Sequence, residues 1–191
     1  MSGPAEPQLP TTSFAVLGLL ASAGESSGYD LKRLADDSLR FFFKIAQSQV
    51  YNELRRLADG GFVTAREVRQ EGRPDKRVFA ITDAGREALE AWIDEGEAHP
   101  VTIVHPVILR MFFGQFADPA RLRRMLERYA ELNDGVVSDL EAIRARLDEF
   151  GDPTFPGMMA EWGVAIYGNE GRAIATALTR LDELAPPEPE D

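Results

Sequence analysis

Residues 122–150 contain a row of mostly apolar side chains whose spacings alternate between four and three without a break. The row consists of Leu122, Leu126, Tyr129, Asn133, Val136, Leu140, Ile143, Leu147 and Phe150. This spacing keeps the row on one side of an α-helix, and that side must be covered by another helix. An asparagine within such a row fixes the register of the paired helices. The row therefore predicts a long helix with a helical partner, in a chain that is mainly α.

The partner of this long helix can belong to a second copy of the chain or to the same chain. The helix that carries the row opens at Asp118-Pro119 and extends about 48 Å, taking a rise of 1.5 Å over roughly 32 residues. This length is long for a small domain to cover alone and favours a subunit contact. The residues assigned to that contact are Leu126, Asn133, Val136, Leu140, Ile143 and Leu147. Burial within one chain is the alternative, with a last helix from about Pro156 to Leu184 as the partner. We expect an antiparallel long-helix dimerisation domain over residues 106–184.

The first half of the chain predicts three helices followed by a β-hairpin. Helices are expected from Thr12 or Ser13 to about residue 21, from residues 27–28 to 39, and from 46 to a stop at the glycines of positions 60–61. Residues 62–69 and 77–81 are rich in β-branched and aromatic residues, and they flank a polar segment with Gly and Pro. Thr82 or Asp83 then caps a fourth helix. This order is that of a winged helix-turn-helix, with a small β-wing, over residues 11–96.

Charge and composition limit the possible partners. The formal net charge is −11, and the chain has no cysteine, which excludes disulfides and thiolate metal sites. Residues 32–77 nevertheless carry 11 bases and 7 acids, whereas residues 97–191 carry 9 bases and 17 acids. We read residues 1–10 and 185–191 as solvated tails and 97–105 as a linker. The longest apolar run is about half of a membrane span, so we expect a cytoplasmic protein without a membrane partner.

The third predicted helix has a face suited to DNA. With Val50, Leu54 and Leu57 as its buried side, a rotation of 100° per residue turns polar and basic side chains outward. These side chains can hydrogen-bond base edges or phosphates, and the hairpin tip adds two cations. An ordinary solvated helix face is the alternative. The candidate DNA-binding residues are Ser48, Gln49, Tyr51, Asn52, Arg55 and Arg56 on the helix, and Arg73 and Lys76 on the wing.

Several segments together resemble the PadR family of bacterial transcriptional regulators. They include Ser27 to Leu31, Ser48 to Leu57, Gly60 to Val63 and Arg77 to Arg86. The second half is similar to that family's C-terminal helical dimerisation domain, the virulence-activator-like type. The resemblance implies a DNA-binding regulator, and it leaves the base preference open because Asn52 stands where Pro or a basic residue is frequent in the family.

The resemblance also raises the possibility of a small aromatic effector, since some relatives sense phenolic acids or planar drugs. Trp92 and Trp162 are the candidate effector-binding residues, with packing in the core or at a subunit interface as the alternative. His99 and His105 lack the neighbours of a metal site. No cofactor is expected. The sequence contains no phosphate loop or nucleophile motif, so we do not expect an enzyme.

The leading hypothesis is therefore a homodimeric repressor that binds double-stranded DNA at a near-palindromic operator. The alternative is a protein-interaction module in which the winged domain binds another protein and the acidic helical half is a scaffold. The two differ in salt dependence, because binding to DNA weakens steeply as the salt concentration rises.

Overall fold

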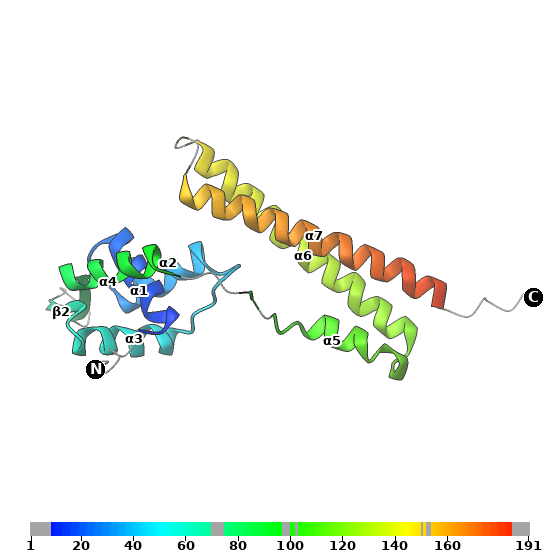
Figure 1. Cartoon of the computed structure of the whole chain (residues 1–191), viewed down its shortest axis with the longest axis horizontal. Coiled ribbons are helices and arrows are strands. Elements are labelled where there is room, and N and C mark those ends of the chain that lie inside the picture. The colour runs from blue at the N-terminus through cyan, green and yellow to red at the C-terminus, as the bar shows by residue number, and fades with distance from the viewer. Residues whose placement is uncertain are drawn as a thin grey trace, which may run out of the picture. The chain divides into compact units, whose positions relative to one another are not determined.

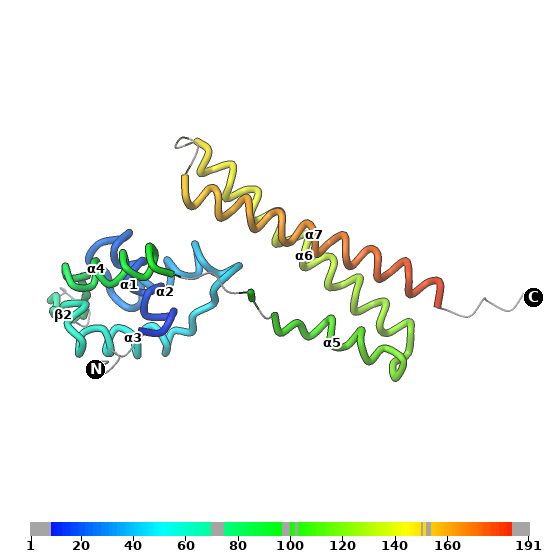
Figure 2. Tube along the Cα trace, in the orientation of Figure 1, coloured from blue at the N-terminus to red at the C-terminus, as the bar shows by residue number. Residues whose placement is uncertain are grey.

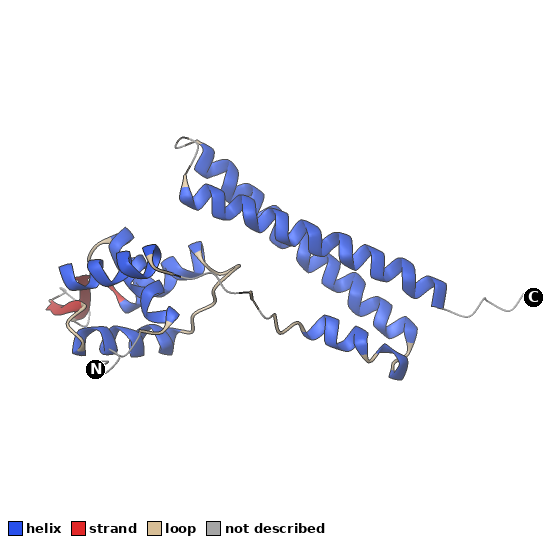
Figure 3. Ribbon diagram, viewed as in Figure 1, coloured by secondary structure: helices blue, strands red, loops and turns tan. Residues whose placement is uncertain are grey.

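The computed structural model divides into an N-terminal unit, residues 1–100, and a helical unit, residues 101–191 (Figures 1 and 3). Each unit has its own packing and is treated separately below. The residues that the structure describes are 9–69, 75–96, 100–101, 103–149, 151 and 154–184.

The N-terminal unit is a winged helix-turn-helix, which confirms the predicted fold class. Its strands form one antiparallel sheet in the order β1-β3-β2. Val63 pairs with Ile81 and Val68 pairs with Lys76, so β2 and β3 form the predicted hairpin. The strand β1 is not anticipated by the sequence; it adds only two pairs, to Phe79 and Val78 of β3. The elements are α1 (Thr11–Ala23), β1 (Ser26–Ser27), α2 (Gly28–Ser38), α3 (Gln47–Asp59), β2 (Val63–Val68), β3 (Lys76–Ile81) and α4 (Asp83–Asp94).

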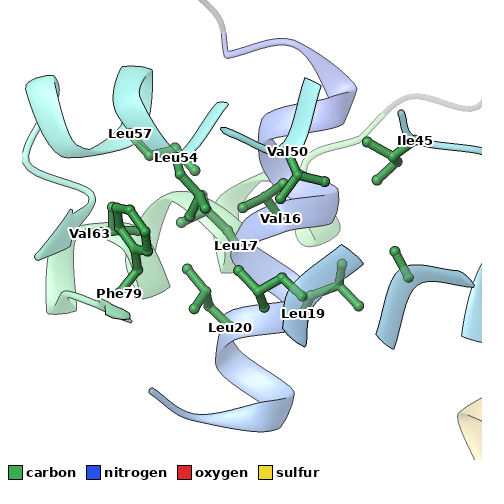
Figure 4. Packing of buried hydrophobic residues seen from close by; sticks show 12 residues of the cluster. Val16, Leu17, Leu19, Leu20, Ile45, Val50, Leu54, Leu57, Val63 and Phe79 are labelled. Carbon is green, nitrogen blue, oxygen red and sulfur yellow. The ribbon is translucent and has the colours of Figure 1, made fainter. Parts of the chain in front are cut away.

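Helix α1 is the centre of the N-terminal core. It is apolar around most of its circumference, and Val16, Leu17 and Leu20 are completely buried. Figure 4 shows Val50 and Leu54 of α3 lying against this helix. A helix of this kind is stable only when it is covered on more than one side.

The start of α1 differs from the prediction. Pro10 occupies the N-cap position, and no side chain caps the helix. Ser13, one of the two predicted caps, is instead buried, and its hydroxyl donates a hydrogen bond to Glu53 Oε2 of α3. By contrast, Thr82 caps α4 as predicted, because its hydroxyl accepts from the Gly85 amide at 3.1 Å.

The helical unit consists mainly of two long helices. The two long helices are α6 (Pro119–Asp148) and α7 (Phe155–Leu184). The helix α5 (Pro106–Phe112) and the short 3₁₀ helix η1 (Gly114–Phe116) precede them in the chain. Helix α6 begins as predicted, with the Asp118 carboxylate accepting from the Ala120 amide at 2.8 Å. The two long helices run side by side (Figure 2). In the part of the chain that the structure describes, no helix is both long and apolar enough to cross a membrane.

The apolar row on α6 packs mainly against α7 of the same chain. Asn133 Nδ2 donates to the Tyr167 carbonyl at 2.9 Å, and this contact sets an antiparallel register. The register brings Leu126 level with Ile174 of α7, and both residues are buried. By the same register Leu140 lies level with Ala160, and both residues are buried.

Part of the row assigned to the subunit contact is already covered within one chain. Leu126 and Leu140 are each 1% exposed and Asn133 is 3% exposed in a single chain, so α7 already covers them. These three residues therefore pack within one chain, and a subunit contact through the row stays a prediction. Val136, Ile143 and Leu147 remain partly exposed. Phe150 lies outside the described residues.

Candidate nucleic-acid interface

Helix α3 presents a polar face to solvent, as its periodicity predicts. Val50, Leu54 and Leu57 are completely buried, so the helix has one well-defined inner side. The exposed positions are Ser48, Gln49, Tyr51, Asn52, Arg55 and Arg56. In the described part of the chain, Arg55 has no carboxylate within ion-pairing distance, so its guanidinium is available to a ligand.

Helix α3 also carries a buried carboxylate that the sequence analysis does not identify. Glu53 is 7% exposed and accepts a hydrogen bond from Ser13 of α1. Its Oε2 lies 3.7 Å from Arg56 Nε. Arg56 therefore partly neutralises the charge of this carboxylate. The spacing of three residues between Glu53 and Arg56 is the sequence feature that indicates such an ion pair on a helix.

The wing differs from the prediction at Lys76. The sequence pattern predicts Lys76 in the connecting tip, but Lys76 is the first residue of β3 and pairs with Val68. Its Nζ lies 2.7 Å from Asp30 Oδ2 at the start of α2. Lys76 is thus shared with a carboxylate of the protein. Arg73 and the rest of segment 70–74 lie outside the described residues.

Asp30 is held in place by three donors. The same Oδ2 atom accepts from Lys76 Nζ, from the Ser27 hydroxyl at 2.7 Å and from the Ser27 amide at 3.4 Å. The hydrogen bond from Lys76 and then the one from Ser27 lower the pKa of Asp30 from 3.8 to about 2. Asp30 is therefore ionised in neutral solution, and it is both a cap of α2 and the partner of Lys76.

A second ion pair joins the wing to the segment before β1. Arg66 of β2 directs Nε at Glu25 Oε1, at 2.6 Å, and its Nη2 contacts the other oxygen of the same carboxylate. This hydrogen bonding lowers the pKa of Glu25 and raises that of Arg66. Two acidic residues, one on each side of β1, thus bind one cation from each strand of the wing.

A groove of about 590 Å³ lies between the start of α2, helix α3 and strand β3. The ring of Tyr51 covers one part of it and lies directly over Gly28; a Cβ at Gly28 would be 2.5 Å from Tyr51 Cε1. The groove is balanced in charge, because three cations face three carboxylates. They are Arg55, Lys76 and Arg77, and Asp30, Asp59 and Asp75.

The two candidate effector residues lie in different units. Trp92 of α4 stacks on Phe14 of α1, with ring centroids 4.9 Å apart and planes within 9°. It therefore packs within the N-terminal unit, although part of the indole stays exposed. Trp162 of α7 is 70% exposed. An effector role for either residue stays a prediction.

His105 has a structural role at the start of α5. Its Nδ1 accepts from the Ile108 amide at 3.2 Å, and its Nε2 lies 3.0 Å from Glu170 Oε1 and 3.1 Å from the Tyr129 hydroxyl. The ring thereby links α5 to both long helices. Over the described residues, no group of three or more metal-binding side chains comes together.

Comparison with known proteins identifies the family. The model of the transcriptional regulator PadR-like family matches residues 16–91. A probable transcriptional regulator of Mycobacterium tuberculosis is 46% identical over 170 residues, covering 84% of this chain and 88% of that protein. The negative transcriptional regulator PadR of Bacillus subtilis is 29% identical over 140 residues, covering 73% of this chain and 76% of that protein.

The same Bacillus subtilis protein is similar in structure. Its crystal structure in complex with operator DNA has a TM-score of 0.78 at 25% identity, covering 90% of this chain and 99% of that one. Its structure in complex with p-coumaric acid has a TM-score of 0.69 at 24% identity, covering 94% and 99%. The similarity thus includes both units and concerns regulators, not enzymes. This chain belongs to the PadR-like family of transcriptional regulators.

Proposed function

We propose that this protein is a homodimeric repressor that binds a near-palindromic operator through α3. The observation that carries this proposal is the exposed outer face of α3, with Gln49, Asn52 and Arg55 directed to solvent. Amide side chains read adenine and arginine reads guanine in the major groove. The Bacillus subtilis relative is a negative regulator, and it is solved with operator DNA.

The remaining candidate residues have supporting roles in this proposal. Ser48, Tyr51 and Arg56 contact the backbone or the neighbouring bases, and Arg73 and Lys76 of the wing contact phosphates. Such contacts position the protein without reading sequence. DNA binding belongs to residues 11–96 and dimerisation to residues 106–184, with 97–105 as the linker. A protein bound to the bacterial chromosome acts in the cytoplasm.

Dimerisation through the helical unit uses the part of the α6 row that α7 leaves partly open. Val136, Ile143 and Leu147 are such residues. A two-fold dimer presents two α3 helices to one face of the duplex, which is the reason for expecting a palindrome. A small aromatic effector, near Trp92 or Trp162, releases the operator; the support is the relative solved with p-coumaric acid.

Selection of DNA fragments from a random pool tests the whole proposal. The selected sequences are expected to contain two inverted half-sites whose centres lie about one helical turn, 10 to 10.5 base pairs, or a multiple of it apart. Sites with one asymmetric half, bound by one protomer, would contradict the dimer. Failure to enrich any sequence would contradict operator binding.

Replacing Arg55 with alanine tests the contact made by α3. The variant is expected to lose about 1 to 3 kcal/mol of binding free energy for the selected operator, and to tolerate more bases at one position of each half-site. Fluorescence anisotropy with the operator and single-base variants measures both effects. Arg172→Ala, an exposed arginine of α7, is the matched control and should bind like the parent. Equal binding by both variants would remove Arg55 from the interface.

A further inference from the structure

The ion pair between Asp30 and Lys76 is placed where a ligand can reach it. The side chains are 33% and 37% exposed, respectively, so the pair is neither buried in the core nor fully in solvent. Both residues line the groove between α2, α3 and β3, together with Tyr51 and Arg55 of α3. A strand of DNA whose major groove receives α3 would bring phosphates to this groove.

Asp30 is held by Ser27 as well as by Lys76. Its carboxylate accepts from the hydroxyl and the amide of Ser27, and its own amide donates to the Ser27 hydroxyl at 3.2 Å. This reciprocal cap holds the carboxylate on the first turn of α2. Lys76, by contrast, ends in a flexible side chain whose ammonium has three donors and can turn toward another anion.

We propose that Asp30 competes with DNA phosphate for Lys76 and thereby lowers the affinity of this protein for every duplex. The inference rests on the proposed function, because it requires α3 and the wing to meet DNA. A carboxylate and a phosphate accept the same ammonium group, so a phosphate that approaches Lys76 must displace Asp30 or share the cation with it. In either case the neighbouring carboxylate repels the phosphate.

The competition affects the sequence-independent part of binding. A phosphate contact carries no base information, so the preference for the operator over other sequences stays unchanged. The salt dependence does change, because each phosphate neutralised by a lysine steepens the slope of log K against log salt by about 0.9. If Asp30 only fastened β3 to α2, its loss would weaken binding and leave the slope unchanged.

The variant Asp30→Asn tests the competition. Asparagine keeps the shape of the side chain and an oxygen acceptor for Ser27, and it removes the charge that holds Lys76. Binding to a fluorescein-labelled duplex of mixed sequence is measured by anisotropy over about 50 to 200 mM salt, and binding to the selected operator in parallel. The slope is expected to steepen by about 0.9, so the loss of affinity between 50 and 200 mM salt should be about 3.5-fold larger than in the parent.

Two further variants separate the competition from a general change in charge. Asp59→Asn removes an equal charge from the same groove without touching Lys76, and it should leave the slope unchanged. In the double variant Asp30→Asn with Lys76→Met, the slope should be no steeper than that of the parent. The proposal is overturned by an unchanged slope in Asp30→Asn or by an equal steepening in Asp59→Asn. It is also overturned if the slope of the double variant is as steep as that of Asp30→Asn.

A measurement on the parent protein covers the case in which Asp30→Asn does not fold. The ¹³C resonance of the Asp30 carboxyl is followed while the mixed-sequence duplex is added, and it should move as Lys76 transfers to phosphate. A resonance that stays in place at saturation overturns the proposal. If the parent binds no duplex at all, the proposed function fails as well; a parent that binds DNA with an unmoved Asp30 resonance contradicts the competition alone.

Discussion

Leu140→Asp is expected to lower the free energy of unfolding of the helical unit by about 3 to 5 kcal/mol, the cost of a buried charge without a partner. Leu140 is 1% exposed on a helix that packs against α7, so the carboxylate would be removed from water. A loss of this size is a large part of the stability of a typical domain. Urea unfolding followed by circular dichroism measures it.

Ala145→Asp is the matched control for this substitution. Ala145 lies on the same helix and is exposed, so the added charge remains in water and the unfolding midpoint should stay close to that of the parent. Because Leu140 is covered within one chain, its variant should lose helix at every protein concentration. If Leu140→Asp keeps its helices and merely dissociates into folded monomers, the packing of Leu140 against α7 is wrong.

Gly85→Ala is expected to destabilise the N-terminal unit by about 3 kcal/mol, near the upper end of the cost of overpacking. A Cβ at this position would lie 2.2 Å from the Phe62 carbonyl oxygen and 2.8 Å from Ile81 Cγ1. The carbonyl cannot move away freely, because it accepts the Thr82 amide at 3.0 Å. The new methyl group therefore forces α4 away from the sheet. Thermal unfolding of the two proteins measures the difference.

Gly18→Ala in α1 is the control, and its effect should have the opposite sign. A Cβ at Gly18 has no described atom within 4 Å. Alanine is the better helix former by about 1 kcal/mol, so the variant should be more stable than the parent. The close contacts with Phe62 and Ile81 are present at Gly85 and absent at Gly18. A stabilised Gly85→Ala protein would show that α4 does not approach the sheet this closely.

Helix periodicity explains the successful predictions. Side chains leave a helix at 100° intervals, so the buried row Val50, Leu54 and Leu57 also defines the exposed face of α3. The same rule identifies the buried side of α6. Caps such as Thr82 and Asp118 are local as well, since they act on amides two or three positions away. Features of this kind depend on residues that are close in sequence.

Contacts between distant residues explain what the local sequence pattern does not show. The apolar row of α6 indicates that a helix covers it, but a helix of the same chain and a helix of a second chain present similar surfaces. Only the register between Asn133 and Tyr167 shows that α7 is the cover. Strand β1 has two residues and no strand-like pattern, because it depends on pairing with β3.

The sequence by itself thus determined the family, the winged helix-turn-helix order and the outward residues of α3, since all of these follow from local pattern. The tertiary structure decided which cationic side chains are paired with carboxylates of the protein itself. The sequence pattern predicts Lys76 as an unpaired lysine at the tip of the wing. Its partner Asp30 lies 46 positions earlier, so the pair cannot be read from local sequence. Arg66 and Glu25 likewise form an ion pair only because the fold places β2 beside the segment before β1. Charge is encoded residue by residue, but neutralisation depends on distances of a few ångströms that only the folded chain creates.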